Sequence, residues 1–190
     1  NEKNISLFFG PKMHLVIYPI NFKSEFNLVI ITRRSLSDEN FFKNEANIKE
    51  FIKDSIIQKN SKFKNFFENV ENIKCFPTFI SDKIRSFSQK NTFFLGDAFY
   101  ASLPTFAQGA SQSIESAYEL YNTLDKNNFN EYFDNRNKRI KMINSRSKLN
   151  YYIFHLSNPL FIFVRNLALK IFMNNKIFLN KYLGKIYLKK

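Results

Sequence analysis

A short stretch between residues 96 and 110 gathers the side chains best suited to bind a ligand. Gly96 and Asp97 end an apolar run, and Gln108 and Gly109 open a helical pattern. A carboxylate at such a turn accepts hydrogen bonds from a sugar or ribitol hydroxyl, and a glycine lets the backbone come close to a ligand. The first N–H groups of the helix and its positive dipole end stabilise negative charge on that ligand. The competing interpretation is an ordinary turn that Asp97 merely caps.

Other reactive side chains are few. The chain has one cysteine, Cys75, and two histidines, His14 and His155. A single cysteine excludes a disulfide within the chain, and two histidines do not by themselves form a zinc cluster, so no metal site is predicted. We interpret Cys75 as a small buried apolar residue and His155 as a capping or packing residue of a helix. No side chain is identified as catalytic.

The elements around the 96–110 stretch follow from the pattern of apolar residues. The segment NTFFLGDA, residues 91–98, holds a short apolar run bounded by polar residues, which predicts a buried strand that ends at Gly96. Residues 107–124 read as a helix whose apolar residues recur at spacings of three and four. These residues are Ala110, Ile114, Ala117, Tyr121 and Leu124.

Two runs rich in β-branched and aromatic residues, 13–20 and 25–33, flank a short polar segment. They predict an antiparallel hairpin or two adjacent strands. Pro19 falls at the end of the first run, where the loss of an N–H is tolerated. Residues 75–84 are interrupted by Pro77 and read as an edge strand or as irregular chain.

The rest of the chain has helical patterns. Residues 37–70 predict two short helices, with Ser37 and Asp38 as candidate caps. Residues 128–150 predict a long charged helix, and the tail after Asn158 predicts one or two amphipathic helices. Within residues 37–70, the pattern over residues 47–56 places four apolar residues on one helix face: Ile48, Phe51, Ile52 and Ile56.

The segment 153–173 is mostly apolar, but Arg165 and Lys170 lie inside it. A charge near the centre of a bilayer costs about 2.5–3.5 kcal/mol on insertion scales. We therefore predict an amphipathic helix, packed or at a membrane interface, rather than a membrane span. The first residues show no signal-peptide pattern, which predicts a cytoplasmic protein that is peripherally membrane-associated if the tail contacts lipid.

The chain carries a net charge of +13, from 29 basic and 16 acidic residues. Such a charge attracts polyanions at low salt. However, 22 of the basic residues are Lys and the chain has 25 Asn, a bias that AT-rich codons produce without selection for nucleic acid. We expect a solvated basic surface and no specific nucleic-acid partner. Arg136 and Arg139 are expected on this solvated surface, with pairing to the sheet as the alternative.

The stretch FFLGDAFYASLPTFAQGASQSIESAYEL resembles the second flavin-binding motif of the FAD-dependent aromatic-ring monooxygenases, which include para-hydroxybenzoate and salicylate hydroxylases. Residues 8–31 are similar to the strands of that family's substrate domain, and residues 132–159 to its arginine-bearing helix, with Arg136 and Arg139 in place. The matching residues of the motif are Gly96, Asp97, Ala98, Pro104, Gln108, Gly109, Ala110, Ile114, Glu115 and Ala117.

The resemblance implies roles for single residues. Asp97 would bond a ribitol hydroxyl of FAD, Pro104 would lie near the isoalloxazine ring, and the backbone of Gln108, Gly109 and Ala110 would face the pyrimidine edge. Together with Gly96, these are the predicted cofactor-binding residues. The implied reaction uses NAD(P)H and O2 to hydroxylate a small aromatic or lipophilic ring, such as a quinone-like ring. His14, Tyr18 and Tyr100 are the predicted substrate-pocket residues.

The chain departs from the family pattern at Tyr100, where the family has His, and at Ser116, where it has Asp. Its four glycines do not form the GxGxxG fingerprint that binds the ADP part of FAD. The resemblance therefore implies the carboxyl-terminal half of such an enzyme, with its amino-terminal half as partner.

The implied fold class is α/β, or α+β for this fragment, as part of a para-hydroxybenzoate-hydroxylase-like FAD fold. Residues 1–90 would complete the substrate domain, with β-strands and helices. Residues 91–126 would supply the last strand and helix of the FAD domain, and residues 127–190 the carboxyl-terminal helices.

Two other functions remain open. One is a different flavoenzyme on the same scaffold, a halogenase or a reductase, because a fold does not fix the chemistry it hosts. The other is a basic module built on residues 136–190 that binds a membrane surface. The membrane module is also compatible with the monooxygenase, if the substrate of that enzyme is a lipophilic ring.

Overall fold

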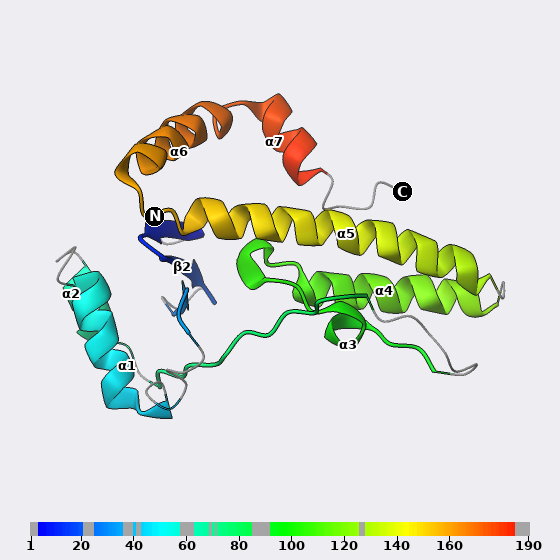
Figure 1. Cartoon of the computed structure of the whole chain (residues 1–190), viewed down its shortest axis with the longest axis horizontal. Coiled ribbons are helices and arrows are strands. Elements are labelled where there is room, and N and C mark those ends of the chain that lie inside the picture. Colours follow the sequence, from blue (N-terminus) through cyan, green and yellow to red (C-terminus); the bar gives the residue numbers. More distant parts are fainter. Residues whose placement is uncertain are drawn as a thin grey trace. The chain divides into compact units, whose positions relative to one another are not determined.

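The computed structural model describes residues 4–20, 25–35, 40, 43–57, 63–68, 70, 72–84, 92–125 and 128–184. The chain divides into two compact units: Asn1–Thr32 together with Phe79–Lys190, and Arg33–Thr78. The described part is a mixed α/β structure that combines helices with a three-stranded antiparallel sheet (Figure 1).

The sheet consists of β1 (Ser6–Gly10), β2 (Met13–Pro19) and β3 (Phe26–Thr32), with β2 in the centre. The β2–β3 ladder pairs Met13 with Thr32 and Pro19 with Phe26, which confirms the predicted hairpin and the place of Pro19. β1 was not predicted. It pairs with β2 through a tight turn in which Lys12 takes a positive φ of 60°.

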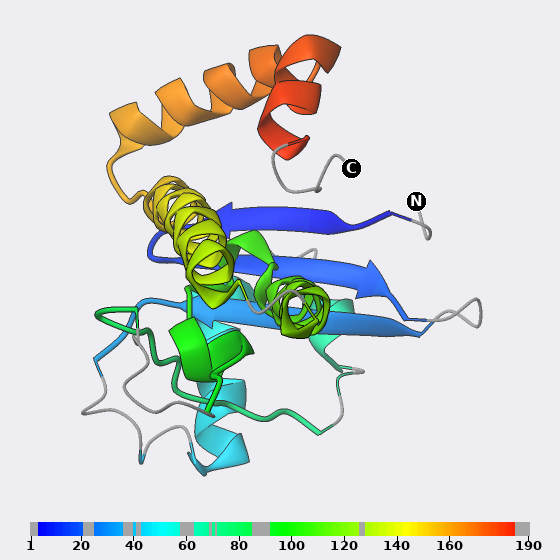
Figure 2. The ribbon, with the colours of Figure 1, turned by 90° about the vertical axis from the view of Figure 1, so that its right-hand side faces the viewer.

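Two long helices form the body of the larger unit. They are α4 (Gly109–Leu124) and α5 (Phe129–Phe154), and they lie side by side in Figures 1 and 2. Both confirm the helices predicted from the sequence. α5 buries one residue per turn along a single face, namely Tyr132, Arg136, Ile140, Ile143, Ser147 and Asn150.

The face that α4 buries is polar. Its buried residues are Gln112 and Ser116, whereas Ile114 and Tyr121 are 72% and 68% exposed. The apolar periodicity of residues 110–124 therefore marks the exposed side of this helix. Burial of the polar side is possible because α5 supplies hydrogen-bond partners, as described below.

The predicted buried strand over residues 91–95 is wrong for the described residues 92–95. They are extended but join no ladder, and the chain then turns into the short helix α3 (Gly96–Tyr100). A strand is stable only where neighbouring strands accept its hydrogen bonds, and no described strand lies beside this segment. The apolar residues of this segment contribute to the core instead, because Phe94 packs against the cluster of Phe99, Tyr100 and Ile140.

The tail forms two helices, α6 (Pro159–Phe172) and α7 (Lys176–Leu183), as predicted. In Figures 1 and 2, both lie on the opposite side of α5 from α4. None of the helices in the described residues has both the length and the apolar character needed to cross a bilayer.

The smaller unit contains α1 (Glu45–Ile52), the π-helical turn η3 (Lys53–Ile57) and α2 (Lys64–Glu68), which confirms helical structure within residues 37–70. Its buried residues include Ile48, Ile52 and Ile56. Asn44 caps α1, and the predicted caps Ser37 and Asp38 lie outside the described residues. Residues 75–84 form no strand.

Candidate functional site

The candidate site lies where α3 meets α4. Gly96 opens α3 with a φ of +52°, a conformation that favours glycine. A Cβ added to Gly96 would stand 2.4 Å from the Ser113 Oγ, so only glycine lets α3 approach α4 this closely. Gly96 therefore has a structural role, which is to bring Asp97 beside the start of α4.

The loop between the two helices is fastened to α5. It contains the 3₁₀ turn η5 (Pro104–Phe106), whose Thr105 Oγ1 donates to the carbonyl of Ser147 at 2.5 Å. Asn150 Nδ2 donates back to the Thr105 carbonyl at 3.1 Å. Ala107 then takes a left-handed conformation, with φ at 50°, and turns the chain into α4. These contacts fix where α4 begins.

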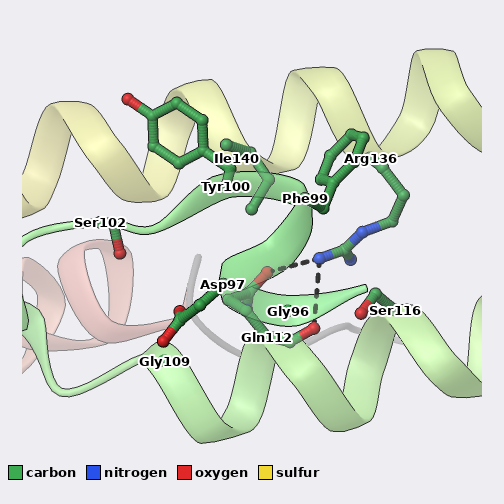
Figure 3. Close-up of a pocket in the computed structure, with 10 residues that line it drawn as sticks. All are labelled: Gly96, Asp97, Phe99, Tyr100, Ser102, Gly109, Gln112, Ser116, Arg136 and Ile140. Atoms are coloured by element: carbon green, nitrogen blue, oxygen red, sulfur yellow. Dashed lines mark hydrogen bonds between the residues drawn. The ribbon is translucent and has the colours of Figure 1, made fainter. Parts of the chain in front are cut away.

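A small pocket lies at this joint. Its volume is about 10 Å³, room for about one water molecule. Figure 3 shows the Asp97 side chain pointing toward the start of α4, where Gly109 lies, whereas the Tyr100 ring points toward α5. Both Asp97 and Gly109 are exposed. The lining residues are Gly96, Asp97, Phe99, Tyr100, Ser102, Gly109, Gln112, Ser116, Arg136 and Ile140.

The structure brings together only some of the predicted site residues. Gly96, Asp97, Gly109 and Tyr100 share the pocket, and Pro104, Gln108 and Ala110 lie on the adjoining loop and helix start without lining it. The predicted substrate residues His14 and Tyr18 do not line it. Tyr18 accepts a hydrogen bond from Asn27.

Tyr100 is a core residue as well as a pocket residue. Its side chain is buried with Phe99 and Ile140. Burial raises the pKa of the Tyr100 hydroxyl, the negative charge of Asp82 adds to this, and a hydrogen bond with Asn144 opposes it. The hydroxyl is therefore neutral at physiological pH.

Beneath the pocket lies an ion network that sequence reasoning missed. Arg136 is 1% exposed, and its Nη1 contacts Glu115 at 2.7 Å and Glu119 at 3.2 Å. Its Nη2 donates to the Gln112 Oε1 at 2.9 Å. Arg139 Nε donates to the same Glu115 oxygen at 2.8 Å, and its Nη2 donates to the other oxygen at 2.9 Å.

The network corrects the expectation that Arg136 and Arg139 lie on a solvated face. Burial raises the pKa of the Glu115 carboxyl, but hydrogen bonds from Arg139 and Arg136 and their charges outweigh this, so that the net pKa is lowered. The signal was present in the sequence. Acidic residues four apart on one helix and arginines three apart on the next are complementary when the helices pack.

The two histidines form a second buried pair. His14 Nδ1 and His155 Nε2 are 2.8 Å apart, and both side chains are buried. Burial, followed by the charge of His155, lowers the pKa of His14 to about 4. His155 lies at the carboxyl-terminal cap of α5 and packs on Tyr151, which confirms its predicted packing role.

Cys75 is exposed and carries a free thiol, so its interpretation as a buried apolar residue is wrong. Cys75 lies near Pro77 in a segment without regular secondary structure. No strand is formed there that would turn the Cys75 side chain inward. Within the described residues, no group of three or more His, Cys, Asp or Glu side chains is placed to hold a metal ion.

The joint presents an exposed rim beside a pocket that is only large enough for about one water molecule. Asp97 and the start of α4 are exposed on a common rim, and nothing lies within 4 Å of a Cβ built on Gly109, so a ligand has access there. The Gln108 Oε1 is buried and has no hydrogen-bond partner among the described residues, so it is an unused acceptor beside the rim. The pocket itself is far too small for a three-ring system.

Comparison of the chain with models of protein families, with curated proteins and with solved structures gives no match.

Proposed function

We propose that this chain is the carboxyl-terminal part of an FAD-dependent monooxygenase that hydroxylates an aromatic or quinone-like ring with NAD(P)H and O2. One observation carries the proposal. The exposed Asp97 side chain points toward the start of α4 at the rim of one pocket. A carboxylate and a helix amino terminus are the two groups that the flavin motif requires together, and this chain presents both to solvent.

Each group has a distinct task in the proposal. Asp97 accepts a hydrogen bond from a ribitol hydroxyl and so fixes the ribitol chain of FAD at the rim. The first N–H groups of α4, at Gly109 and Ala110, donate to the pyrimidine edge of the ring. The dipole of this 16-residue helix stabilises negative charge at that edge. When bound, FAD supplies the redox chemistry, and the residues of this chain hold and orient it.

The loop geometry supports this division of tasks. Thr105 is held to α5 by the bonds with Ser147 and Asn150, so Pro104 and the Gln108 backbone stay at a fixed distance from the start of α4. Fixed donors stabilise developing charge without reorganising, which is what a flavin site needs. An amino-terminal FAD unit covers the other side of the ring in this proposal, since the pocket of this chain cannot.

The test is flavin retention by the chain purified together with an amino-terminal half that carries GxGxxG. We expect the complex to keep the visible absorbance bands of FAD through gel filtration. Asp97→Ala should weaken retention by about tenfold or more, because it removes a charge-assisted hydrogen bond.

The matched control is Asp134→Ala, which removes an exposed carboxylate from α5 outside the pocket. It should leave retention unchanged. A complex that stays colourless in excess FAD would refute the proposal. Equal retention by the Asp97→Ala and Asp134→Ala variants would refute the role of Asp97.

A further inference from the structure

The positive charge of the chain is concentrated at one end. Residues 1–134 contain 16 basic and 16 acidic residues, and residues 135–190 contain 13 basic residues and no acidic one. The entire net charge of +13 therefore lies in the last 56 residues, which form most of α5 and all of α6 and α7. This segment faces any anionic surface without an opposing carboxylate of its own.

Helix α6 carries an exposed apolar stripe within this basic segment. Its members follow the spacing of one helix face, and their side chains are 49–66% exposed. They are Leu160, Phe163, Val164, Leu167 and Ile171. Lys170 is exposed on the same helix, and Ile177, near the start of α7, is 80% exposed. Aromatic and aliphatic residues beside Lys are typical of helices that lie in a membrane interface.

The opposite face of α6 is held against the rest of the unit. The Arg165 guanidinium lies 4.7 Å from the centroid of the Phe9 ring, and its Nη1 donates to the Ile153 carbonyl at 3.3 Å. Phe172 stacks on Phe178 of α7, with centroids 4.7 Å apart. These contacts are made by residues outside the stripe, and the stripe residues themselves remain 49–66% exposed.

Helix α7 anchors the pair to α5. The Tyr182 hydroxyl donates to the Asn150 Oδ1 at 2.9 Å, and the Arg146 guanidinium lies 4.6 Å from the centroid of the Tyr182 ring. The two helices thus form a fixed support for the stripe on the side of α5 away from α4 (Figures 1 and 2). Pre-ordering lowers the entropy lost when a surface binds.

We propose that α6 docks this protein on an anionic lipid bilayer. The apolar stripe enters the boundary between headgroups and acyl chains, and the exposed Lys170 and Lys176 contact lipid phosphates. Charge decides the choice of partner. A second copy of the chain would bring another α6–α7 surface with Lys170, Lys176 and Lys181 and no carboxylate to the same interface, which like-charge repulsion opposes. An anionic bilayer supplies both the apolar layer and the negative charge.

The proposal is independent of the flavin site and is tested with the full chain and sedimented vesicles. One set contains phosphatidylcholine alone, and the other contains phosphatidylcholine with phosphatidylglycerol. We expect binding to the anionic set that falls steeply with salt, and at least tenfold weaker binding to the neutral set.

Two double variants separate the apolar and charge contributions. Phe163→Ser with Leu167→Ser should weaken binding to anionic vesicles tenfold or more. Lys170→Glu with Lys176→Glu should do the same and should also flatten the salt dependence. The matched control is Ile114→Ser with Tyr121→Ser, which removes apolar side chains from α4 that are at least as exposed and should leave binding unchanged.

Circular dichroism verifies that each variant keeps its helices, and the salt dependence of the unaltered chain needs no variant. Equal binding to neutral and anionic vesicles would overturn the proposal. So would equal losses in the α4 and α6 variants. A dimer in solution that the α6 variant abolishes, without vesicle binding by the unaltered chain, would assign the stripe to a second copy instead.

Discussion

Arg136 is a buried guanidinium whose hydrogen-bond acceptors come from α4. Replacing Arg136 by Met leaves the Gln112 Oε1 without its donor and leaves Glu115 with Arg139 as its remaining arginine partner. Removing one partner of a buried ion pair costs about 3–5 kcal/mol. We expect Arg136→Met to lower the free energy of unfolding in urea by about 3 kcal/mol. Lys138→Met, at an exposed position on the same helix, should change it by less than about 0.5 kcal/mol; equal losses would contradict the network.

The His14–His155 pair predicts a pH dependence of stability. The pKa of folded His14 is about 4, below its ordinary value of 6.5. Between these values the unfolded chain binds a proton that the folded chain does not, so stability falls as pH drops from 6.5 to 4. Above pH 6.5 and below pH 4 the two states bind equally at this site.

The expected loss from His14 is about 3 kcal/mol over this window. It is measured as the difference between the unaltered chain and His14→Gln, because carboxylates that titrate near pH 4 affect both proteins alike. Urea unfolding at intervals between pH 7 and pH 4 gives the two curves. Parallel curves would show that His14 does not titrate with a lowered pKa.

Single residues were predictable where a motif set their type. The sequence placed Asp97 and Gly109 at one joint, and both lie on one rim. It could not place His14 against His155, because a contact across 141 residues has no periodic signal. Arg136 and Arg139 were read as solvated because their spacing matches that of Glu115 and Glu119 only once α4 and α5 are known to pack together.

The two glycines of the α3–α4 joint differ in what they do for the fold. Gly96 has a positive φ and no room for a Cβ, whereas Gly109 has open space around it. We expect Gly96→Ala to lower the free energy of unfolding by about 1–2 kcal/mol or more, since an L-residue is strained there. Gly109→Ala should leave stability equal or slightly higher, because Ala favours helix.

Gly109→Ala should weaken flavin binding even though it does not lower stability. Its Cβ would occupy the space through which the proposed ligand approaches, so Gly109→Ala should weaken FAD binding although the fold is intact. Thermal unfolding and flavin retention are measured on the same preparations. A Gly109→Ala protein that is destabilised but binds FAD normally would contradict the assignment.

Elements were predicted well in type and less well in environment. The strands 13–20 and 25–33 and the helices after residue 107 were predicted because each has a clear apolar period. The period did not reveal which side is covered, and Ile114 and Tyr121 face solvent on α4. The expected strand at 91–95 failed because an apolar run signals burial, and a packed loop before a helix satisfies that signal as well as a strand does.

At the scale of the whole molecule, the net positive charge lies in the last part of the sequence. The part through Asp134 is electrically balanced, and the part after it is entirely basic. The sequence alone shows this division of charge. Only the structure shows that Arg165 ties α6 to the rest of the unit while the apolar stripe of α6 stays exposed. Helices α3 and α4, which form the proposed flavin edge, lie on the opposite side of α5 from α6 (Figure 1). Either can therefore be altered without disturbing the other.

The central claim is that the joint of α3 and α4 is one edge of a flavin site. The most direct measurement is a nuclear magnetic resonance titration of the isotope-labelled chain with millimolar FAD, since residue-resolved shifts report even weak binding. We predict saturable shifts of the backbone amides of Asp97, Gly109 and Ala110, with none at the exposed Ile114 on the same helix, and their loss in Asp97→Ala. An absence of saturable shifts, or shifts confined to the basic tail after Asp134, would contradict the account.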